Sequence, residues 1–399
     1  MHLFECLKTS VVYIIYKKYI LRLIVYTGKG GTGKTVTSCA TAIGLSEIGY
    51  RTLLISADPA HTISDALCID IGYSTKTIDS NLDAIEIDPL FEISKDYVDI
   101  ISSISSSFIG NGVQSSIAYE IAMLPGMTQL FSLIKIEELV RKNNYEKIVL
   151  DMPASGEALK FLYFPKLMGS MGRRITGFTN LFSGFAKMFQ PMSSYSAYLD
   201  SFITQTDILK RLDNLFNILS NQTITSLRLV TNLNNFSVKN AKRALMSASL
   251  FGINVDLVII NKVDVRDESK QRYLEKIKLN FFPLPCRQAI LMEEELEGIE
   301  MLRQHNYHIF GREDPSNIFF NEKVYSIEEN KDSLTLKFKI PFVNNSPFDI
   351  QKQNDELIIT LEHDRGMLAN TVTLPLAAVT MKIMSSTIVN DQLVVILKR

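Results

Sequence analysis

The chain has few cysteines, and none of them lies near another. Cys6, Cys39, Cys68 and Cys286 occur singly among 399 residues, and no C-x-x-C pair is present. Disulfide frameworks and structural zinc sites need cysteines that cluster at short spacing. The sequence therefore disfavours both, and we expect a protein of the reducing cytoplasm whose cysteines serve as small apolar side chains.

The chain also lacks long hydrophobic runs and an excess of one charge sign. No segment approaches the roughly 18 apolar residues of a membrane-spanning helix, and 42 basic side chains balance 43 acidic ones. Balanced charge offers no chain-wide basic surface, so we expect no nucleic-acid partner. Residues 1–20 contain a short apolar run that two lysines end, with no cleavage site after it, and we interpret them as an N-terminal extension.

What the chain does contain is a nucleotide-binding loop between a strand pattern and a helix pattern. Residues 28–35 read GKGGTGKT, which fits the P-loop spacing G-x-x-x-x-G-K-[ST]. An apolar run from Leu21 precedes the loop and a small-residue helical pattern follows it, as the motif requires. A glycine turn that binds nothing is the alternative, and the full match with its flanking elements disfavours it.

Each residue type in this loop has a task in binding ATP together with Mg²⁺. The backbone is expected to turn tightly at the four glycines of the loop, Gly28, Gly30, Gly31 and Gly33. The N–H groups of the loop, that of Thr32 among them, would then face phosphate oxygens at the positive end of the following helix. Lys34 would reach the β- and γ-phosphates, and the Thr35 hydroxyl would coordinate Mg²⁺.

A second lysine, Lys29, follows the first glycine, where an ordinary P-loop needs none. The sequence K-G-G-x-G-K-T resembles the deviant Walker A motif of dimeric ATPases. That resemblance implies a homodimer in which Lys29 reaches the partner's nucleotide and stabilises transition-state charge, as an arginine finger does. A solvated loop lysine is the alternative.

After the loop, short apolar runs alternate with longer helical patterns. This predicts an α/β fold, a P-loop NTPase with a mostly parallel, doubly wound sheet. Strands are expected at 52–56, 145–150 and 257–260. Each leads into polar residues, among them Asp58, Asp151 and Asn261, and ligands bind at the carboxyl ends of the strands in such sheets. Ordinary turn chemistry is the alternative for all three residues.

The ordered motifs of the chain resemble those of the ArsA family. They read GKGGTGKT, DPAHTISD, AIEIDP, DMPASGEALKFL and NKVDV over about residues 21–310. The family comprises arsenite-pump ATPases and relatives that target tail-anchored membrane proteins. The resemblance implies a dimeric, Mg²⁺-dependent ATPase whose partner is a membrane transporter subunit or a hydrophobic protein client.

The same resemblance implies site roles by matching position. Asp58 would belong to switch I and orient or deprotonate the attacking water, while His61 would be structural. Asp151 would be the Walker B type carboxylate behind Mg²⁺, with Gly156 of switch II sensing the γ-phosphate through its backbone. Asn261 would bind the adenine.

The chain departs from the family pattern in two respects. Switch II reads DMPASGE where the family has D-T-A-P-T-G-H, so Met152, Ser155 and Glu157 replace the usual residues. No cysteine lies between Cys68 and Cys286, whereas arsenite sensing, zinc-closed dimers and iron–sulfur dimers all use thiolates. We therefore expect altered switch coupling and none of those cysteine sites.

Residues 161–192 form an apolar, methionine-bearing stretch with two interpretations. Methionine suits adaptable hydrophobic surfaces, and the client groove of the targeting ATPases lies in a comparable helical region. The stretch is then a switch-controlled binding surface. Ordinary helical core is the other interpretation.

From about residue 318 the pattern changes to short strands separated by turn residues. This predicts a small β-sandwich over 318–399. Strands are expected at 323–328, 333–340, 356–361, 378–384 and 392–397. The ending resembles the α-crystallin domain of small heat-shock proteins. Such a domain binds extended segments along a sheet edge, or serves only for packing or dimer support.

These observations indicate a homodimeric ATPase in which ATP closes the dimer and hydrolysis reopens it, driving an attached transporter or client. Two other functions stay open. One is a partitioning or cell-division-positioning ATPase with the same loop. The other is an ATP-gated holdase, in which the apolar helices and the sandwich bind exposed hydrophobic chains and turnover is incidental. Fold alone does not choose among them.

Overall fold

The computed structural model describes residues 21–58, 60, 62–97, 127–172, 208–330, 332–344, 346–363 and 366–399. The predicted N-terminal extension, Pro59, His61 and residues 173–192 of the apolar stretch lie outside the described residues. The start of that stretch is described, and there Phe161 and Leu162 are buried in the core. None of the described helices combines the length and apolar content that crossing a bilayer requires.

An eight-stranded sheet forms the centre of the nucleotide-binding part, in the order β3-β4-β2-β5-β1-β6-β7-β8. All neighbouring pairs are parallel except β3 with β4. The strands are β1 (Arg22–Gly28), β2 (Thr52–Ser56), β3 (Lys76–Asp79), β4 (Leu82–Glu86), β5 (Lys147–Ala154), β6 (Thr225–Asn232), β7 (Val255–Val263) and β8 (Cys286–Ile290). The predicted α/β fold class is confirmed.

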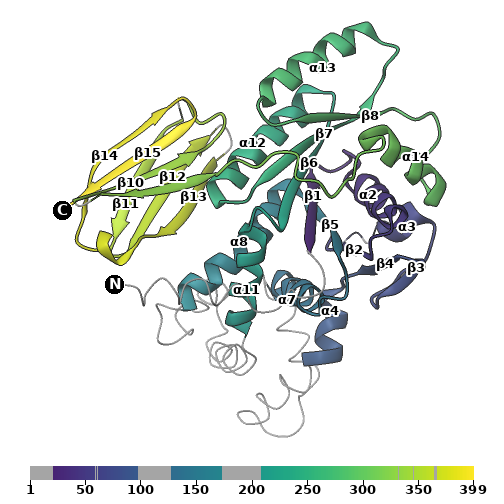
Figure 1. The fold of residues 1–399 in the computed structure, drawn as a ribbon, viewed down its shortest axis with the longest axis horizontal. Helices are drawn as coiled ribbons and strands as arrows, with labels where there is room; N and C mark the ends of the chain where they lie inside the picture. Colours follow the sequence, from purple (N-terminus) through teal and green to yellow (C-terminus); the bar gives the residue numbers. More distant parts are fainter. Residues whose placement is uncertain are drawn as a thin grey trace, which may run out of the picture.

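Helices cover both faces of this sheet. Side chains alternate along β1, so that Leu23 and Val25 join one buried cluster while Ile24 and Tyr26 join the other. The first cluster is covered by α7 (Met127–Arg141), α8 (Ser155–Gly172), α11 (Ile208–Ser220), α12 (Asn235–Phe251) and α13 (Glu268–Phe281). The second is covered by α2 (Lys34–Ile48), α3 (Ile63–Leu67) and α14 (Gly298–Phe310). Figure 1 shows α2, α3 and α14 together on one side of the sheet.

Strand β1 lies in the middle of the sheet, and its central residues 23–26 are apolar. All seven of its residues are buried, and it pairs with β5 on one side and β6 on the other. Parallel strands that are covered on both faces have such continuous apolar sequences. The loop that follows β1 is thereby placed at the centre of the carboxyl edge. A short α4 (Pro89–Glu92) and a π-helical turn (Ile93–Tyr97) follow β4.

The C-terminal part is a sandwich of two antiparallel sheets, with strand orders β14-β15-β10-β9 and β11-β12-β13. Its strands are β9 (Tyr325–Glu329), β10 (Ser333–Lys339), β11 (Phe348–Gln353), β12 (Glu356–His363), β13 (Gly366–Thr373), β14 (Lys382–Val389) and β15 (Gln392–Lys398). Alternate residues of β10 and β15 are buried. One buried cluster continues from the large sheet through α8 and α12 into this sandwich, so the two parts share a core. The predicted C-terminal β domain is confirmed.

Several strand predictions need correction. Two sandwich strands, β11 and β13, were not predicted, because polar residues such as Asp349 and Asn370 interrupt their apolar pattern. The strand predicted at 378–384 begins only at Lys382, since a 3₁₀ turn (Leu376–Ala378) follows Pro375. In the large sheet, β5 continues past the predicted end at residue 150 to Ala154. Asp151 therefore lies within a strand and not after it.

Two buried arginines hold the segment that leads into the sandwich. Arg228 forms an ion pair with Asp256, 3.2 Å between the nearest atoms, and also donates to the carbonyl of Pro315 at 2.7 Å. Arg22, the first residue of β1, donates to the carbonyl of Ser316 at 2.9 Å. Removing one partner of such a buried pair costs about 3–5 kcal/mol, because the remaining charge stays buried. The linker is therefore fixed to the amino-terminal half of the sheet.

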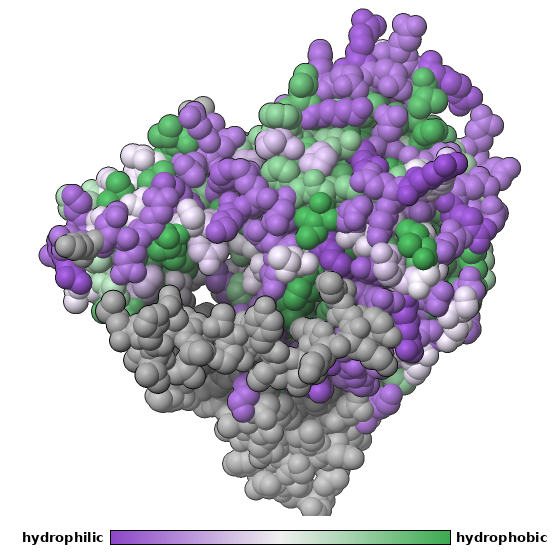
Figure 2. All heavy atoms as spheres, in the orientation of Figure 1, coloured by the Kyte–Doolittle hydropathy of each residue, from purple (hydrophilic) through white to green (hydrophobic). Residues whose placement is uncertain are grey.

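The surface of the described residues is mostly hydrophilic on the face shown in Figure 2, with apolar residues scattered among polar ones. One cleft of about 480 Å³ lies where α12 and α13 meet the sandwich. Its apolar lining includes Phe282, Phe320 and Phe342. Outside this cleft, the apolar residues scattered over the face shown in Figure 2 are normal for a protein surface.

Helix α14 packs its one fully buried histidine against the helix that follows the nucleotide loop. His305 is 0% exposed, its Nε2 lies 3.5 Å from the Thr37 hydroxyl of α2, and its Nδ1 has no partner among the described residues. Burial, together with the nearby His308, lowers the pKa of His305 to about 4. The ring is therefore neutral in the folded protein at neutral pH.

Acidification is expected to destabilise the fold through His305. Between the folded pKa of about 4 and the ordinary value of 6.5, the unfolded chain binds the proton and the folded chain does not. Going from about pH 7 to about pH 5 should then lower the free energy of unfolding by ~2 kcal/mol more in the wild type than in His305→Leu. Chemical denaturation at the two pH values measures this difference.

The exposed Gln304 on the same helix supplies the control. Gln304→Leu should keep the full pH dependence of the wild type, because it places the same side chain on α14 and removes no titratable group. Equal pH dependence in wild type and His305→Leu would show that His305 does not titrate as described.

Candidate functional site

The loop between β1 and α2 has a conformation that only glycine allows at two positions. Gly31 and Gly33 have φ angles of 74° and 89°, in the left-handed region that side chains disfavour. A Cβ atom on Gly33 would lie 2.1 Å from the side-chain nitrogen of Asn261, and one on Gly28 would lie 2.2 Å from the carbonyl oxygen of Val230. The backbone angle therefore requires glycine at position 31, close packing requires it at position 28, and both require it at position 33.

Positive charge gathers where this loop enters α2. Lys34, the first residue of the helix, is only 7% exposed, and no hydrogen bond or ion pair engages its ammonium in the described part of the chain. No side chain caps the helix start at Gly33. Free backbone N–H groups, the helix dipole and a buried ammonium together make an anion-binding site. Thr32 closes the loop on itself, since its hydroxyl donates to the Lys29 carbonyl at 2.7 Å.

The buried carboxylate of Asp151 faces the start of α2. One of its oxygens accepts a hydrogen bond from the Thr35 hydroxyl at 2.9 Å, and the other has no partner among the described residues. The Thr35 hydroxyl also lies 3.0 Å from that of Thr62. Burial, with a smaller contribution from Asp58, raises the pKa of Asp151 to about 7 against the opposing effects of Thr35 and Lys34. A carboxylate and a hydroxyl placed in this way are ligands that Mg²⁺ prefers.

Asp58 lies at the turn after β2, within electrostatic reach of Asp151. It is partly exposed, and one of its oxygens accepts a hydrogen bond from the backbone N–H of Ala60 at 3.1 Å. The turn that was considered as an alternative for Asp58 is thus present. Its carboxylate nevertheless remains accessible beside the buried one.

Lys29 is half-buried and contacts an aromatic ring that sequence reasoning missed. Its ammonium lies 4.8 Å from the centre of the Phe236 ring, at the start of α12. Phe236 is 49% exposed. A cation over an exposed ring contributes only ~0.5–1 kcal/mol, so this contact can be exchanged for another at little cost.

Two asparagines near the carboxyl ends of β6 and β7 hold the loop through hydrogen bonds to its carbonyl groups. Asn261, 1% exposed, donates from its side chain to the Thr32 carbonyl at 2.9 Å and accepts from the Lys262 N–H at 2.8 Å. Asn232 pairs with Asn261 in the sheet register and donates to the Gly31 carbonyl at 3.4 Å. Sequence reasoning missed Asn232. Its place at the end of an apolar strand, like that of Asn261, was the available signal.

The residues that depart from the family's switch II pattern have structural tasks. Met152 is fully buried in the core beneath the first cluster of helices. The Ser155 hydroxyl donates to the side-chain oxygen of Asn240 in α12 at 2.7 Å. Gly156 is an exposed residue in the first turn of α8, where a Cβ atom would meet nothing within 4 Å, and the neighbouring Glu157 is exposed too.

Comparison with known proteins agrees with this geometry. The family of ArsA ATPases, described as anion-transporting ATPase, matches residues 21–311. A protein of Chlorobaculum tepidum named as an arsenical pump-driving ATPase is 32% identical over 89% of this chain and 91% of its own length. One of Aquifex aeolicus with the same designation is 31% identical over 85% and 91%. The ATPase get3 of Aspergillus niger is 27% identical over 71% and 89%.

The position of Asn261 predicts that it supports the phosphate-binding conformation of the loop, a role that can be distinguished experimentally from binding of adenine. Replacing Asn261 with alanine removes the bond to the Thr32 carbonyl, and losing a buried hydrogen bond of this kind costs about 1–3 kcal/mol, or roughly 5- to 100-fold in phosphate affinity. We expect the affinities for MgATP and for magnesium tripolyphosphate to fall by the same factor. Isothermal titration calorimetry measures both.

If Asn261 binds adenine instead, only MgATP should lose affinity, since tripolyphosphate has no base. Asn280→Ala serves as the control, because the Asn280 side chain bonds Lys242 away from the loop. That variant should bind both ligands as the wild type does.

Proposed function

Because the chain belongs to the ArsA family of anion-transporting ATPases, we propose that it is a Mg²⁺-dependent ATPase that works as a homodimer and couples ATP-driven closing and reopening to a transporter or a hydrophobic client. The observation that carries the proposal is the pairing of Asp151 with Thr35 beside the unpaired ammonium of Lys34. ATPase function itself agrees with the names of the relatives. The magnesium, the dimer and the coupled partner are the proposed parts.

Thr35 and Asp151 are the residues that would hold Mg²⁺. The unpartnered oxygen of Asp151 supports this, because a fully buried carboxylate oxygen without a hydrogen bond is costly unless a cation or water completes it. Bound Mg²⁺ would neutralise charge on the phosphates and orient them. Lys34 and the loop N–H groups would bind the phosphate oxygens. The N–H of Thr32 donates to the Lys29 carbonyl at 3.2 Å in this structure and would exchange that bond for one to phosphate.

Asp58 is proposed to orient or deprotonate the attacking water. Its carboxylate is accessible while Asp151 is not, and the hydrogen bond from Ala60 fixes its direction. Two carboxylates close together, one buried and one accessible, can divide the tasks of holding a cation and accepting a proton. Gly156 would sense the γ-phosphate through its backbone, as in the family.

Lys29 is proposed to act across the dimer interface, as in the deviant Walker A group. The exposed ring of Phe236 holds it in this chain through a weak contact. Exchange of that contact for the partner's phosphate would give a strong charge-assisted one. Transition-state charge would then be neutralised only when two chains close together.

For the coupled partner, the described cysteines favour a hydrophobic client over an arsenite-sensing pump. Burial raises the pKa of Cys39 well above its ordinary value and that of Cys286 to about 12. Thiols that stay protonated are poor ligands, because the thiolate is the binding form. The three described cysteines are free thiols, which fits the proposed location in the cytoplasm. The C-terminal sandwich would act as an α-crystallin-like domain.

Asp58→Asn is expected to separate hydrolysis from binding. Loss of a general base lowers turnover by about 10²- to 10⁴-fold, while ATP affinity should stay within about twofold, since Asp58 contributes no phosphate contact. A coupled assay for released phosphate, with and without Mg²⁺, and calorimetric titration with ATP measure the two effects.

Asp65→Asn is the matched control, because Asp65 is an exposed aspartate in α3, close to Asp58 in the chain. It should hydrolyse ATP at the wild-type rate. An absence of Mg²⁺-dependent turnover in the wild type would refute the ATPase proposal, and equal loss in both variants would refute the role of Asp58.

The partner class can be tested by stimulation of the same assay. A hydrophobic tail-anchor peptide is expected to raise the wild-type ATPase rate or to be captured by Asp58→Asn in the presence of ATP, whereas arsenite should leave the rate unchanged. Stimulation by arsenite alone would restore the anion-pump role. Capture of the peptide at equal strength without ATP would favour a holdase whose turnover is incidental.

A further inference from the structure

Helix α8 begins at the edge of the sheet that holds the candidate nucleotide site. Strand β5, which contains Asp151, ends at Ala154, and α8 begins at the next residue, Ser155. The hydrogen bond from Ser155 to Asn240 also ties this first turn to α12. A shift of the backbone at Asp151 is therefore passed directly to α8, because a helix moves as a rigid element over a few turns.

The third and fourth turns of α8 meet strand β13 of the C-terminal sandwich, mainly at Asn370. The hydroxyl of Tyr163 and the ammonium of Lys166 both donate to the side-chain oxygen of Asn370 in β13, the second at 2.9 Å. Residues three apart lie on the same face of a helix, which lets both side chains reach one acceptor. The backbone N–H of Thr371 donates in turn to the Tyr163 hydroxyl at 3.2 Å.

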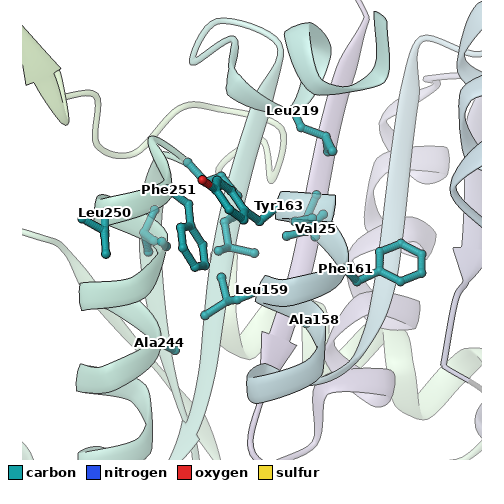
Figure 3. Close-up of a cluster of buried hydrophobic side chains, with 14 of the residues drawn as sticks. Val25, Ala158, Leu159, Phe161, Tyr163, Leu219, Ala244, Leu250 and Phe251 are labelled. Carbon is teal, nitrogen blue, oxygen red and sulfur yellow. The ribbon is translucent and has the colours of Figure 1, made fainter. Parts of the chain in front are cut away.

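The same asparagine also reaches α12. Its side-chain nitrogen donates to the carbonyl of Leu250, and Asn370 is only 3% exposed. The Tyr163 ring stacks on that of Phe251, with 4.2 Å between the ring centres; Figure 3 shows the two rings side by side, with Leu250 next to them. Both ends of one buried amide are thus engaged, which joins α8, α12 and the sandwich in one polar network.

Lys166 makes separation of α8 from the sandwich costly. Its ammonium lies over the rings of Tyr163 and Phe216, at 5.2 and 5.7 Å from their centres, and burial lowers the pKa of Lys166 to about 8. An ammonium withdrawn from water needs its acceptor. A movement of α8 that keeps this hydrogen bond must take Asn370 with it.

The second attachment of the sandwich, at its linker, lies away from the carboxyl edge that holds the candidate nucleotide site and is not expected to move with it. Arg22 and Arg228 fix the linker at Pro315 and Ser316 to the amino-terminal half of the sheet. The sandwich is therefore held through its linker, which stays with the sheet, through Asn370, which is bonded to α8 and α12, and through apolar packing on α12 and α13.

We propose that α8 transmits the state of the nucleotide site to the sandwich through Tyr163, Lys166 and Asn370, and that the sandwich turns about its linker in response. The inference rests on the proposed function, because it takes the ligand beside Asp151 to be a nucleotide. The C-terminal domain is then gated by nucleotide and is more than a packing support.

Amide hydrogen exchange of the full chain tests this coupling. It is measured without nucleotide, with MgADP and with Mg²⁺ plus a non-hydrolysable ATP analogue. In the wild type, peptides from the loop at 28–35 and from β13 should both change their exchange rates by about fivefold or more between states. In Tyr163→Phe the loop should respond as before while the response of β13 becomes smaller, and in the double variant Tyr163→Phe/Lys166→Met, which removes both donors to Asn370, the response of β13 should fall below about twofold.

Tyr163→Phe keeps the ring on Phe251 and loses only the hydroxyl, so the fold is expected to persist. Tyr145→Phe is the matched control, because the Tyr145 hydroxyl donates at 2.7 Å to Asp83, on β4 of the large sheet. That variant should respond in both regions like the wild type.

The outcomes distinguish the inference from the proposed function. A loop that responds to nucleotide in the wild type while β13 does not would overturn the inference and leave the proposed function standing. An unchanged β13 response in Tyr163→Phe/Lys166→Met would overturn the assigned route. No response of the loop to any nucleotide would contradict the proposed function, and the inference with it.

Discussion

The hydrogen bond between the Thr35 hydroxyl and the buried Asp151 carboxylate joins the parts on which the site depends. Thr35 belongs to the start of α2, Asp151 to the central strand β5, and Thr62 at the start of α3 lies against the same hydroxyl. Burial opposes the charge of Asp151, while Thr35 and Lys34 favour it. Such a carboxylate destabilises a core unless a ligand uses its second oxygen. Asp151 is therefore both the residue that costs stability and the residue that offers a free oxygen to a ligand.

At the opposite, amino-terminal half of the sheet, charges are also buried, but there the protein itself supplies their partners. Arg228 is fully buried, but Asp256 pairs with it and the carbonyl of Pro315 accepts one of its remaining N–H groups. Arg22 is satisfied by the carbonyls of Ser316 and Ile224 and by the hydroxyl of Ser226 in β6. Directional contacts of buried charges fix an orientation more narrowly than apolar packing does. The linker therefore enters the sandwich along one path, even though the two parts share an apolar core.

The sequence predicted those features that local patterns determine. The loop at 28–35, strand β2 and the location of Asp58 and Asp151 at one sheet edge follow from spacing and apolar runs. The contacts of Asn232 and Asn370 could not be predicted, because each acts on residues far away in the chain, at Gly31 and at Tyr163. Strands β11 and β13 were missed for a related reason. In β13 the polar Asn370 is satisfied by tertiary contacts that no local pattern records, and in β11 alternate residues such as Asp349 are exposed, so that no continuous apolar run marks the strand.

The switch II segment shows why a departure in sequence need not mean a loss of coupling. The expectation of altered coupling treated this segment as a loop with unusual residues. In the structure β5 runs to Ala154 and α8 begins at Ser155, so no loop separates the strand from the helix. Met152 anchors the strand in the core and Ser155 anchors the helix to α12. A strand joined to a helix without an intervening loop transmits a displacement, whereas a flexible loop would absorb it. The direct junction between β5 and α8 is therefore the feature that would let a site of this kind act on a distant domain.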